Sequence, residues 1–377
     1  MERKGICFTR RLPPFEIKAR LLCSGARVDA EAKELFERQN PSRVKRGGLS
    51  SGGKIRLDRG LFVNFPFYER RETPLTVLKE PNRELGVLIS ENGNPIASAE
   101  VLMPPAWYNE EVEGFPITRI FTAHNRQLAT AVYEDCALFY TGEQCRFCAI
   151  NRSLSDKDPK LVRKSGDLLV AALDKIPVRD YGGITLNGGM TLTPARGMEV
   201  LAPVVERIRK SYPEIPIAVE ITPPQGLDWI DWLAASGASS LMMNLETWDS
   251  VLRSKLLPGK DGYCPREQYL YAFERALKVF GPGKISTCFV VGTEPMESLR
   301  EGISKVVSMG VVPSPLAGRY FEDIPDYPFV PDVDWKDFLD IVLYAASEMR
   351  KAGKSIADKA GCVACGMCDL VRDAFFS

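Results

Sequence analysis

The middle of the chain alternates between short apolar runs and longer amphipathic segments. The apolar runs are bounded by turn residues and have the length of buried strands, whereas the amphipathic segments repeat apolar residues at the three- and four-residue spacings typical of helices. Such alternation requires parallel strands joined by crossover helices. We expect strands at 128–135, 182–186, 216–221, 240–246, 285–292 and 311–318, and helices at 166–176, 195–212, 227–236, 266–280 and 296–310.

This alternation predicts an α/β fold in the form of an open, partial (β/α)6 barrel over residues 116–325. In such a barrel the loops that leave the C-terminal ends of the strands build the active site. A doubly wound sheet is the alternative arrangement of the same elements.

The N-terminal segment, residues 1–115, has a different pattern and is expected to form a small β-rich domain. Strands are predicted at 62–67 and 74–80, followed by a hairpin in which 86–90 and 95–103 flank the turn ENGN. A short helix is expected at 29–38, with Ala32, Leu35 and Phe36 on one side. At the other end, residues 326–377 contribute an amphipathic helix at 334–355 and a cysteine-bearing tail.

Charge and hydropathy narrow the class of protein. Lys plus Arg equals Asp plus Glu at 49 each, so no global field favours nucleic acid or an anionic membrane surface. No apolar stretch approaches the roughly 18 residues needed to span a bilayer. The start MERKGICFTRRLPPFE lacks the apolar core of a secretory signal. We therefore expect a cytoplasmic protein in a reducing compartment.

Ten cysteines in a reducing compartment are better explained as metal ligands, catalytic groups or buried thiols than as disulfides. Six of them form two tight groups, while Cys7, Cys23, Cys264 and Cys288 are scattered. The single histidine, His124, argues against His-based zinc hydrolases and against Ser-His or Cys-His catalysis. No residue is assigned a general acid or base role.

The first group, Cys136, Cys145 and Cys148, lies just past the first expected barrel strand in CALFYTGEQCRFC. Three thiolates at the end of such a strand can hold three irons of a cubane cluster and leave the fourth iron open to a small chelating ligand. A structural zinc site that uses a fourth ligand is the alternative.

Together with Phe147, which precedes the third cysteine, this group resembles the radical S-adenosylmethionine (SAM) superfamily. That family binds SAM to a [4Fe–4S] cluster, commonly with C-x3-C-x2-C spacing. Here eight residues separate Cys136 from Cys145, so the spacing departs from the family pattern. The resemblance implies that one-electron reduction of SAM yields a 5′-deoxyadenosyl radical, which takes a hydrogen atom from an unactivated C–H bond. It also implies an electron donor of the ferredoxin or flavodoxin type.

The resemblance assigns SAM contacts to residues at several strand ends. Phe147 and Gly292 are expected beside the adenine, and Asn244 and Glu246 at the ribose or methionyl group. Gly188 and Gly189 are expected to offer only a main-chain contact to the methionyl amine, because Met190 replaces the Glu of the family's turn. An ordinary βα turn at the glycines and a helix cap at Asn244 and Glu246 are the alternatives.

The second group, Cys362, Cys365 and Cys368, has the spacing C-x2-C-x2-C in GCVACGMC. This spacing is typical of iron–sulfur ligands, and we expect an auxiliary cluster, of the [4Fe–4S] type. Its fourth ligand is expected from Cys7, Cys23 or a non-cysteine group. Zinc, a mononuclear iron and a redox-active thiol pair are the alternatives. Cys264 and Cys288 are expected to be buried thiols.

The segment GKISTCFVVGTEP resembles biotin synthase, but LNGGMT and AVEITPP lack the cysteines that hold the sulfur-donating cluster of that enzyme. A barrel of this kind with a terminal cysteine triplet resembles the two-component lipoyl synthases. The resemblance implies sulfur insertion into an octanoyl group on a lipoyl-carrier protein, with a second radical SAM protein as partner. Four basic residues after the fourth and sixth strands are expected either to contact carboxylates of SAM or an acidic carrier, or to remain solvated: Arg253, Lys255, Lys260 and Arg319.

Two other functions stay open at this point. The first is a radical SAM enzyme of different chemistry on a small molecule, with the auxiliary cluster as an electron relay. The second is a non-catalytic iron–sulfur or zinc scaffold that binds a partner. Either enzyme is expected to cleave SAM reductively, whereas the scaffold is expected to cleave none.

Overall fold

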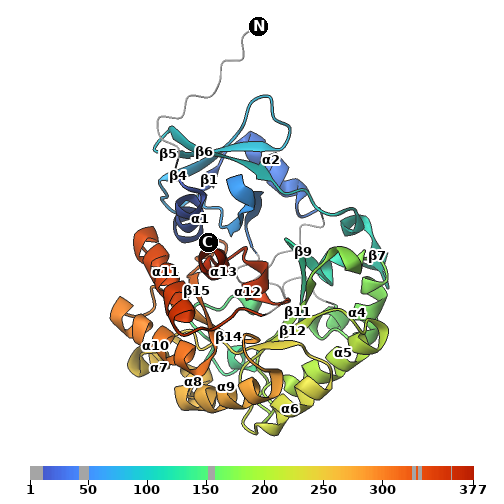
Figure 1. The fold of residues 1–377 in the computed structure, drawn as a ribbon. Coiled ribbons are helices and arrows are strands. Elements are labelled where there is room, and N and C mark those ends of the chain that lie inside the picture. The colour runs from blue at the N-terminus through green and yellow to red at the C-terminus, as the bar shows by residue number, and fades with distance from the viewer. Residues whose placement is uncertain (1–11, 42–50, 152–157, 325–327, 330–332, 358) are drawn as a thin grey trace.

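A curved seven-stranded sheet forms the centre of the molecule (Figure 1). The computed structural model describes residues 12–41, 51–151, 158–324, 328–329, 333–357 and 359–377. The strands follow the order β15-β14-β13-β12-β11-β10-β9, in which β10 to β15 are parallel and β9 is antiparallel to β10. Their bounds are β9 Thr122–His124, β10 Gln127–Tyr133, β11 Gly183–Gly188, β12 Ile217–Glu220, β13 Ser240–Met242, β14 Ile285–Val291 and β15 Val312–Ala317.

The strand order settles the choice between the two expected folds. A doubly wound sheet reverses its strand order at a switch point, whereas here the parallel strands follow one another in sequence order without reversal. All seven residues of β14 are buried, as expected for a parallel strand covered on both faces. The structure therefore has the expected α/β class with an open parallel sheet. His124 lies in the additional strand β9, just before the first barrel strand β10.

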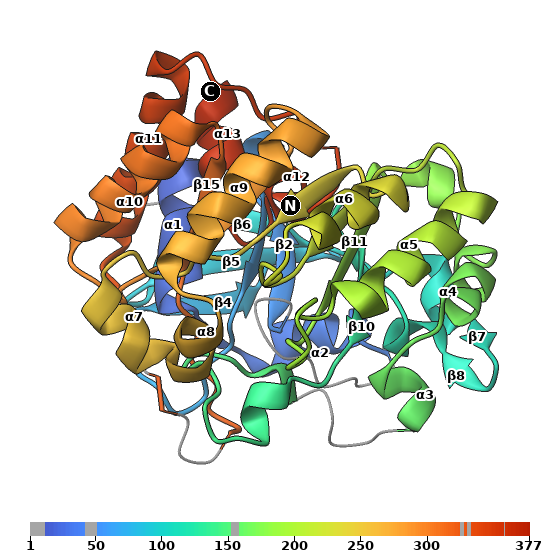
Figure 2. The same cartoon turned by 90° about the horizontal axis from the view of Figure 1, so that it is seen from below.

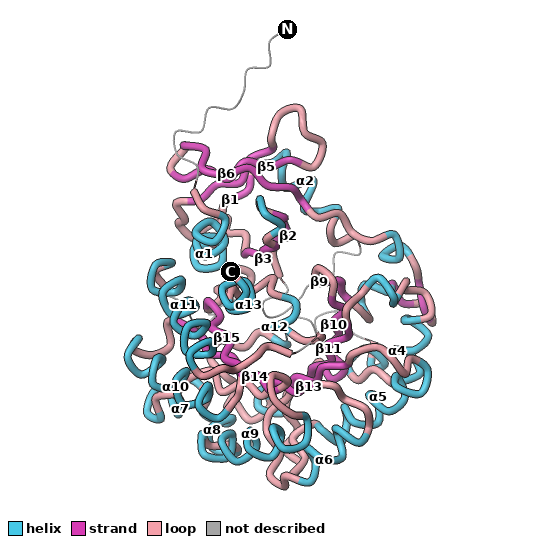
Figure 3. Tube along the Cα trace, viewed as in Figure 1, coloured by secondary structure: helices cyan, strands magenta, loops and turns pink. Residues whose placement is uncertain are grey.

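Helices line the outer side of this sheet, as Figures 1 and 3 show. The apolar residues that recur in these helices at spacings of three and four are buried, as the sequence pattern predicted. Short helices that were not expected, α3, α7 and α8, are inserted between the strands. The bounds are α3 Pro159–Val162, α4 Gly166–Leu173, α5 Met198–Ser211, α6 Asp228–Ala235, α7 Ser250–Leu256, α8 Pro258–Tyr263, α9 Arg266–Phe280, α10 Met296–Met309 and α11 Trp335–Lys351.

The N-terminal segment contains a second sheet with the strand order β1-β4-β5-β6-β2-β3. The expected hairpin joins β5 to β6, and its turn residues Asn92 and Gly93 both have positive φ, as a type I′ turn requires. The helix predicted at 29–38 is α2, which buries Ala32, Leu35 and Phe36. The bounds are β1 Arg27–Val28, α2 Ala30–Arg38, β2 Gly53–Arg56, β3 Phe62–Phe65, β4 Leu75–Lys79, β5 Gly86–Glu91, β6 Asn94–Val101, β7 Glu111–Val112 and β8 Phe115–Pro116.

A further N-terminal helix, α1 (Pro14–Ser24), was not expected from the sequence. It lies beside α11 and the C-terminal helix α13 (Val371–Phe376), as Figures 1 and 2 show from two directions. One continuous hydrophobic core includes buried residues from α1, the N-terminal sheet, the parallel sheet and α13. Within the described residues, no helix combines the length and apolar character that a membrane span requires.

The cysteine-bearing tail enters the curved sheet from the N-terminal ends of its strands. The Ala357 N–H donates to the Gly283 carbonyl just before β14 (3.0 Å), and the Lys359 carbonyl accepts from Gln127 Nε2 at the start of β10 (2.9 Å). The tail then forms the short helix α12 (Cys362–Cys365), which lies within the opening of the curved sheet in Figure 1. The tail is therefore part of the interior.

Candidate functional site

Cys136 follows β10 and is anchored by the neighbouring strand end. The Ala137 N–H donates to the Met190 carbonyl (2.9 Å), and the Gly189 N–H donates to the Tyr133 carbonyl (2.8 Å). A Cβ atom at Gly189 would lie 2.1 Å from the Asp135 carbonyl oxygen and 2.7 Å from the Cys136 Cα. Glycine is therefore required at 189 by the close approach of the Cys136 backbone, whatever else this turn contacts.

Cys145 and Cys148 lie in the loop beyond Cys136, and α7 and α8 hold that loop in place. The Arg146 N–H donates to the Leu256 carbonyl (2.8 Å), and the Gly259 N–H donates to the Glu143 carbonyl (3.0 Å). Cys148 and Cys145 are joined by a main-chain hydrogen bond of 3.0 Å. Although α7 and α8 were not expected from the sequence, they position the second and third cysteines of the group.

The three thiols of the first group influence one another. Burial, and then the Glu246 carboxylate, raise the pKa of Cys145 well above its usual range, with smaller contributions from Cys148 and Cys136. Burial raises the pKa of Cys148 to about 12. Without a metal these sites hold protonated thiols, so a metal must displace protons when it binds.

This group has the donor set of an iron–sulfur cluster. Cys136 and Cys148 both act electrostatically on Cys145, so the three thiols are neighbours. Cysteine thiolates are the usual ligands of such clusters, and three of them leave one iron of a cubane open to a further ligand. Zinc with a fourth ligand uses the same donors.

Asn244 and Glu246 follow β13 and carry the polar groups nearest to the first group of cysteines. The Asn244 side chain donates to Glu220 Oε1 (2.5 Å) and accepts from the Cys288 N–H (3.2 Å). The Glu246 carboxylate pairs with Lys260 Nζ at 2.8 Å, and both side chains are nearly buried. Glu246 also has a φ of 70°, which is unusual for a residue other than glycine.

Lys260 is therefore neither a solvated loop charge nor a free cation. Burial lowers its pKa, but Glu246, Tyr269 and Cys145 together outweigh burial and hold the pKa well above the usual range. Its ammonium group also donates to the Asn244 carbonyl (3.2 Å). Lys260 thus fixes the two residues that the resemblance assigns to SAM.

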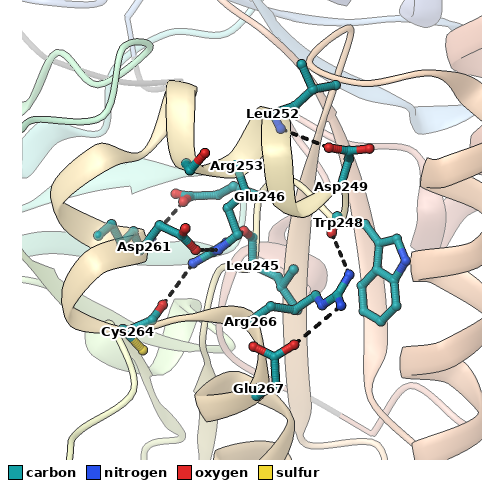
Figure 4. A network of polar contacts seen from close by, with 12 residues as sticks. Leu245, Glu246, Trp248, Asp249, Leu252, Arg253, Asp261, Cys264, Arg266 and Glu267 are labelled. Atoms are coloured by element: carbon teal, nitrogen blue, oxygen red, sulfur yellow. Dashed lines mark hydrogen bonds and ion pairs between the residues drawn. The ribbon is translucent and has the colours of Figure 1, made fainter.

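Arg253 corrects the expectation for the basic residues, as Figure 4 shows. This fully buried side chain pairs with Asp261 (2.7 Å) and donates to the carbonyl oxygens of Leu245 and Cys264. Its guanidinium lies 4.9 Å from the ring centroid of Tyr269. Arg253 therefore fixes the loop after β13 and has no donors directed at a ligand's carboxylate. Two more of the four basic residues complete this set. Lys255 is exposed, which agrees with the alternative of a solvated loop charge, and Arg319 is buried.

Phe147 belongs to the loop that carries Cys145 and Cys148, and it packs near the end of β14. Gly292 is the first residue after β14. The Phe147 ring packs edge-on against Phe329 at a centroid distance of 5.7 Å, in a small apolar cluster with Ala149, Val290 and Phe321. Gly292 has a φ of 94°, so the turn after β14 requires glycine at this position.

The tail group contacts residues on three sides of the interior. Cys362 Sγ lies 3.7 Å from Glu220 Oε2, and Cys365 Sγ lies 3.6 Å from the His124 carbonyl oxygen. The side chain of Asn64 hydrogen-bonds to Cys368. Burial raises the pKa of Cys365 to about 12 and also raises the pKa of Cys368, whereas the Cys362 side chain is exposed. The three thiols have the C-x2-C-x2-C spacing and the donor type of iron–sulfur ligands.

Glu220 is a site residue that sequence reasoning missed. Burial raises the pKa of its carboxyl group, which contacts Asn244 on one oxygen and Cys362 on the other. The available signal was a lone carboxylate at the end of the otherwise apolar strand PIAVEI. A continuous set of polar contacts thus leads from the tail group through Glu220 and Asn244 to Lys260 and Glu246.

The remaining described cysteines are buried thiols. Cys264 is buried with its sulfur 3.8 Å from the Pro223 carbonyl oxygen, and Cys288 is buried within β14, as expected for structural thiols. Cys23 is buried in α1, where burial raises its pKa far above the usual range. Cys7, the other expected candidate for a fourth tail ligand, lies outside the described residues.

No protein-family profile matches the sequence. The chain is similar to the bacteriochlorophyllide c C-7(1)-hydroxylase of Chlorobaculum limnaeum, with 26% identity over 326 residues that cover 76% of this chain and 79% of the hydroxylase.

Among solved structures, HydG, a maturase of the [FeFe]-hydrogenase, aligns with a TM-score of 0.46 and 15% identity, covering 64% of this chain and 56% of HydG. A radical SAM methyltransferase from Sphaerobacter thermophilus aligns with a TM-score of 0.43 and 14% identity, covering 75% of this chain and 76% of the methyltransferase. The coproporphyrinogen III oxidase of Escherichia coli, a radical SAM enzyme, aligns with a TM-score of 0.36 and 15% identity over 46% of this chain and 41% of the oxidase.

Proposed function

We propose that this chain is a radical SAM enzyme that activates an unactivated C–H bond of its substrate. The observation that carries the proposal is the position of Cys136 just after β10, at the C-terminal ends of parallel strands, with Cys145 and Cys148 in the loop that follows and in electrostatic contact with it. A [4Fe–4S] cluster with bound SAM supplies one-electron cleavage of the sulfonium, which yields a 5′-deoxyadenosyl radical. The protein itself binds and orients SAM and the substrate, and it excludes water.

The residues around the first group are suited to that work. The Glu246 carboxylate is fixed by Lys260 and by main-chain bonds to β14, from the Glu246 N–H to the Cys288 carbonyl (2.8 Å) and from the Val290 N–H to the Glu246 carbonyl (2.8 Å). A carboxylate fixed in this way can accept hydrogen bonds from ribose hydroxyls without first losing side-chain freedom. Asn244 is held between Glu220 and the Cys288 N–H. The superfamily resemblance assigns both residues to SAM.

A second cluster on Cys362, Cys365 and Cys368 forms part of the proposal. A cluster at this place supplies either electron transfer or sulfur. The resemblance of a barrel with a terminal cysteine triplet to the two-component lipoyl synthases favours the second role. That role is the lipoyl synthase-like reaction on an octanoyl group carried by a lipoyl-carrier protein, with a second radical SAM protein as partner. Electrons would come from a ferredoxin- or flavodoxin-type donor.

Hydroxylation is the second candidate reaction, and one observation favours it. The similar protein from Chlorobaculum limnaeum is a hydroxylase that acts on a tetrapyrrole, and the similarity extends over about three quarters of both chains. Under this candidate the substrate is a chlorophyllide-like ring system and the product carries an added oxygen rather than an added sulfur.

The central test is reductive cleavage of SAM by the anaerobically reconstituted protein with dithionite. We expect 5′-deoxyadenosine and methionine from the wild type and from Cys264→Ala, whose thiol is buried apart from both groups. Cys145→Ala should form neither product. A wild-type protein that carries its iron but cleaves no SAM would overturn the proposal and leave the non-catalytic scaffold.

The two reactions are separated by their products. Incubation with an octanoyl-carrier protein and, in parallel, with bacteriochlorophyllide c should give a product heavier by sulfur or by oxygen, respectively. In the sulfur reaction Cys365→Ala should retain slow, uncoupled SAM cleavage but give no thiolated product. Growth of an oxygenated product over many turnovers would exclude consumption of the tail cluster as the source of the added atom.

A further inference from the structure

Residues far from the tail in sequence form the wall of the tail cysteine loop. Lys18 Nζ, in α1, donates to the Gly366 carbonyl (2.5 Å) between the second and third tail cysteines. The Asn64 N–H, in β3, donates to the Met367 carbonyl (3.0 Å). Arg319, which follows β15, donates from Nη2 to the Asn64 carbonyl (2.7 Å). The N-terminal sheet and the chain after β15 therefore enclose the loop together.

Two of these wall residues are buried cations. Lys18 is fully buried and Arg319 is 5% exposed. Lys18 Nζ is bonded to the carbonyl between Cys365 and Cys368, and Arg319 is bonded to Asn64, which in turn bonds to the tail loop. Positive charge thus lies against the loop that carries Cys365 and Cys368.

The carboxylates near the tail compensate these cations only in part. Asp373 pairs with Lys18 (2.8 Å), but its side chain is 28% exposed and is screened by solvent. Asp369 is buried, and its carboxylate accepts from the neutral Ser314 hydroxyl (2.6 Å).

The first cysteine group has a different environment. Glu246 and Lys260, which both act on Cys145, pair with each other at 2.8 Å, and both side chains are nearly buried. The strand-end group therefore has a buried ion pair beside it, whereas the tail group has a buried arginine and a buried lysine whose carboxylate partner is partly exposed.

The reduction potential of an iron–sulfur cluster depends on nearby charge, on hydrogen bonds to its sulfurs and on solvent exposure. A buried cation favours the more negative, reduced state of a cluster, and a low local dielectric enlarges that effect. We propose that Lys18 and Arg319 hold the reduction potential of the tail cluster above that of the strand-end cluster. This inference rests on the tail cluster of the proposed function, and it makes Lys18 and Arg319 tuning residues rather than ligands.

If Lys18 and Arg319 had a purely structural role, their substitution would change the free energy of unfolding but not the reduction potential of the tail cluster. The reduction potential is therefore the deciding measurement. The double variant Cys145→Ala/Cys148→Ala isolates the tail cluster, and Cys362→Ala/Cys365→Ala isolates the strand-end cluster. Redox titrations of the two reconstituted proteins, followed by electron paramagnetic resonance, should give the higher potential for the tail cluster.

Lys18→Met in the tail-only background should lower the ratio of reduced to oxidised tail cluster about tenfold at a fixed applied potential, a shift of roughly 59 mV. Lys18→Arg should restore the wild-type value. The matched control is Lys164→Met, which removes another buried lysine, one that donates to the Ala131 carbonyl and pairs with Glu134 beside β10. That control should leave the potential unchanged.

Arg319→Gln provides the same test if Lys18→Met does not fold, and it should shift the potential in the same direction. An unchanged potential in a variant that keeps its four irons would overturn this inference and leave the proposed function intact. A tail-only protein that binds no cluster at all would instead refute the tail cluster itself, and this inference with it.

Discussion

The Sγ atom of Cys362 lies 3.7 Å from Oε2 of Glu220, the last residue of β12. Through this contact the tail reaches the polar residues that follow the neighbouring strand, because the other oxygen of Glu220 accepts from Asn244 (2.5 Å). Asn244 and Glu246 are both bonded to Lys260. The two cysteine groups therefore share one polar interior, although they are separated by more than 200 residues in the sequence.

Iron content should divide between the two groups. We expect about eight irons per chain in the reconstituted wild type and about four in each double variant that removes one cysteine group, since each cubane contains four. Cys264→Ala should keep the wild-type count, because its thiol is buried against the Pro223 carbonyl. A count near one per group would indicate single metal ions instead of clusters.

Gly189→Ala should disrupt the first group through packing alone. The added Cβ would lie 2.1 Å from a backbone oxygen, a clash that no side-chain movement can relieve. We expect a loss of about 3 kcal/mol in the free energy of unfolding, together with reduced iron binding at the first group. Urea denaturation measures the loss. Gly262→Ala, where nothing lies within 4 Å of the added atom, is the control and should leave stability nearly unchanged.

Lys260→Met should leave the Glu246 carboxylate buried without its charge partner. Removal of one member of a buried pair costs about 3–5 kcal/mol. We expect that loss in the free energy of unfolding, with weaker SAM binding measured by calorimetry. Lys255→Met, at an exposed position nearby, should change neither quantity. Full stability in Lys260→Met would contradict the importance of the pair, whereas recovery in Lys260→Met/Glu246→Gln would support it.

Glu322→Gln should weaken the contact between the N-terminal region and the chain after β15. Desolvation raises the pKa of Glu322, but hydrogen bonds from the backbone N–H groups of Arg71, Glu69 and Arg70 outweigh it and hold the pKa below its ordinary value. A lowered folded-state pKa contributes stability above the unfolded value of about 4.3, and this contribution is lost as pH falls through the folded value.

At pH 7 we therefore expect Glu322→Gln to be about 1–2 kcal/mol less stable than the wild type, from the loss of charge-assisted hydrogen bonds. The difference should shrink progressively as pH falls below about 4.3. Urea midpoints across this range measure it. A difference independent of pH would mean that the charge of Glu322 makes no contribution.

The sequence was sufficient to predict the strands and long helices of the parallel sheet. Strands such as β14 are covered on both faces and read as continuous apolar runs, so local pattern and tertiary burial agree. Helix α1 was missed because Lys18 occupies a fully buried position and interrupts the apolar spacing of Ile17, Leu21 and Leu22. A buried lysine acquires its partners only in three dimensions, and no local pattern reports them.

The candidate site was predictable to a similar extent. The cysteine spacings identified both groups of thiols, because chelation constrains spacing along the chain. The role of Arg253 was not predictable, since its partners Asp261, Leu245 and Cys264 form a network that depends on how α7 and α8 fold back on β13. For Gly189 the sequence predicted a main-chain contact with a ligand. The structure shows in addition that the Cys136 backbone approaches this glycine so closely that no side chain fits.

The hydrogen bond between Lys18 and Gly366 joins residues 348 positions apart. At the usual rate of bacterial or eukaryotic translation, the ribosome needs about 20–70 s to make that much chain. Helix α1 therefore leaves the ribosome long before the loop it covers exists. Under the proposed function, the tail cluster can be assembled only after synthesis has passed Cys368, so its loading follows the folding of α1 rather than accompanying it.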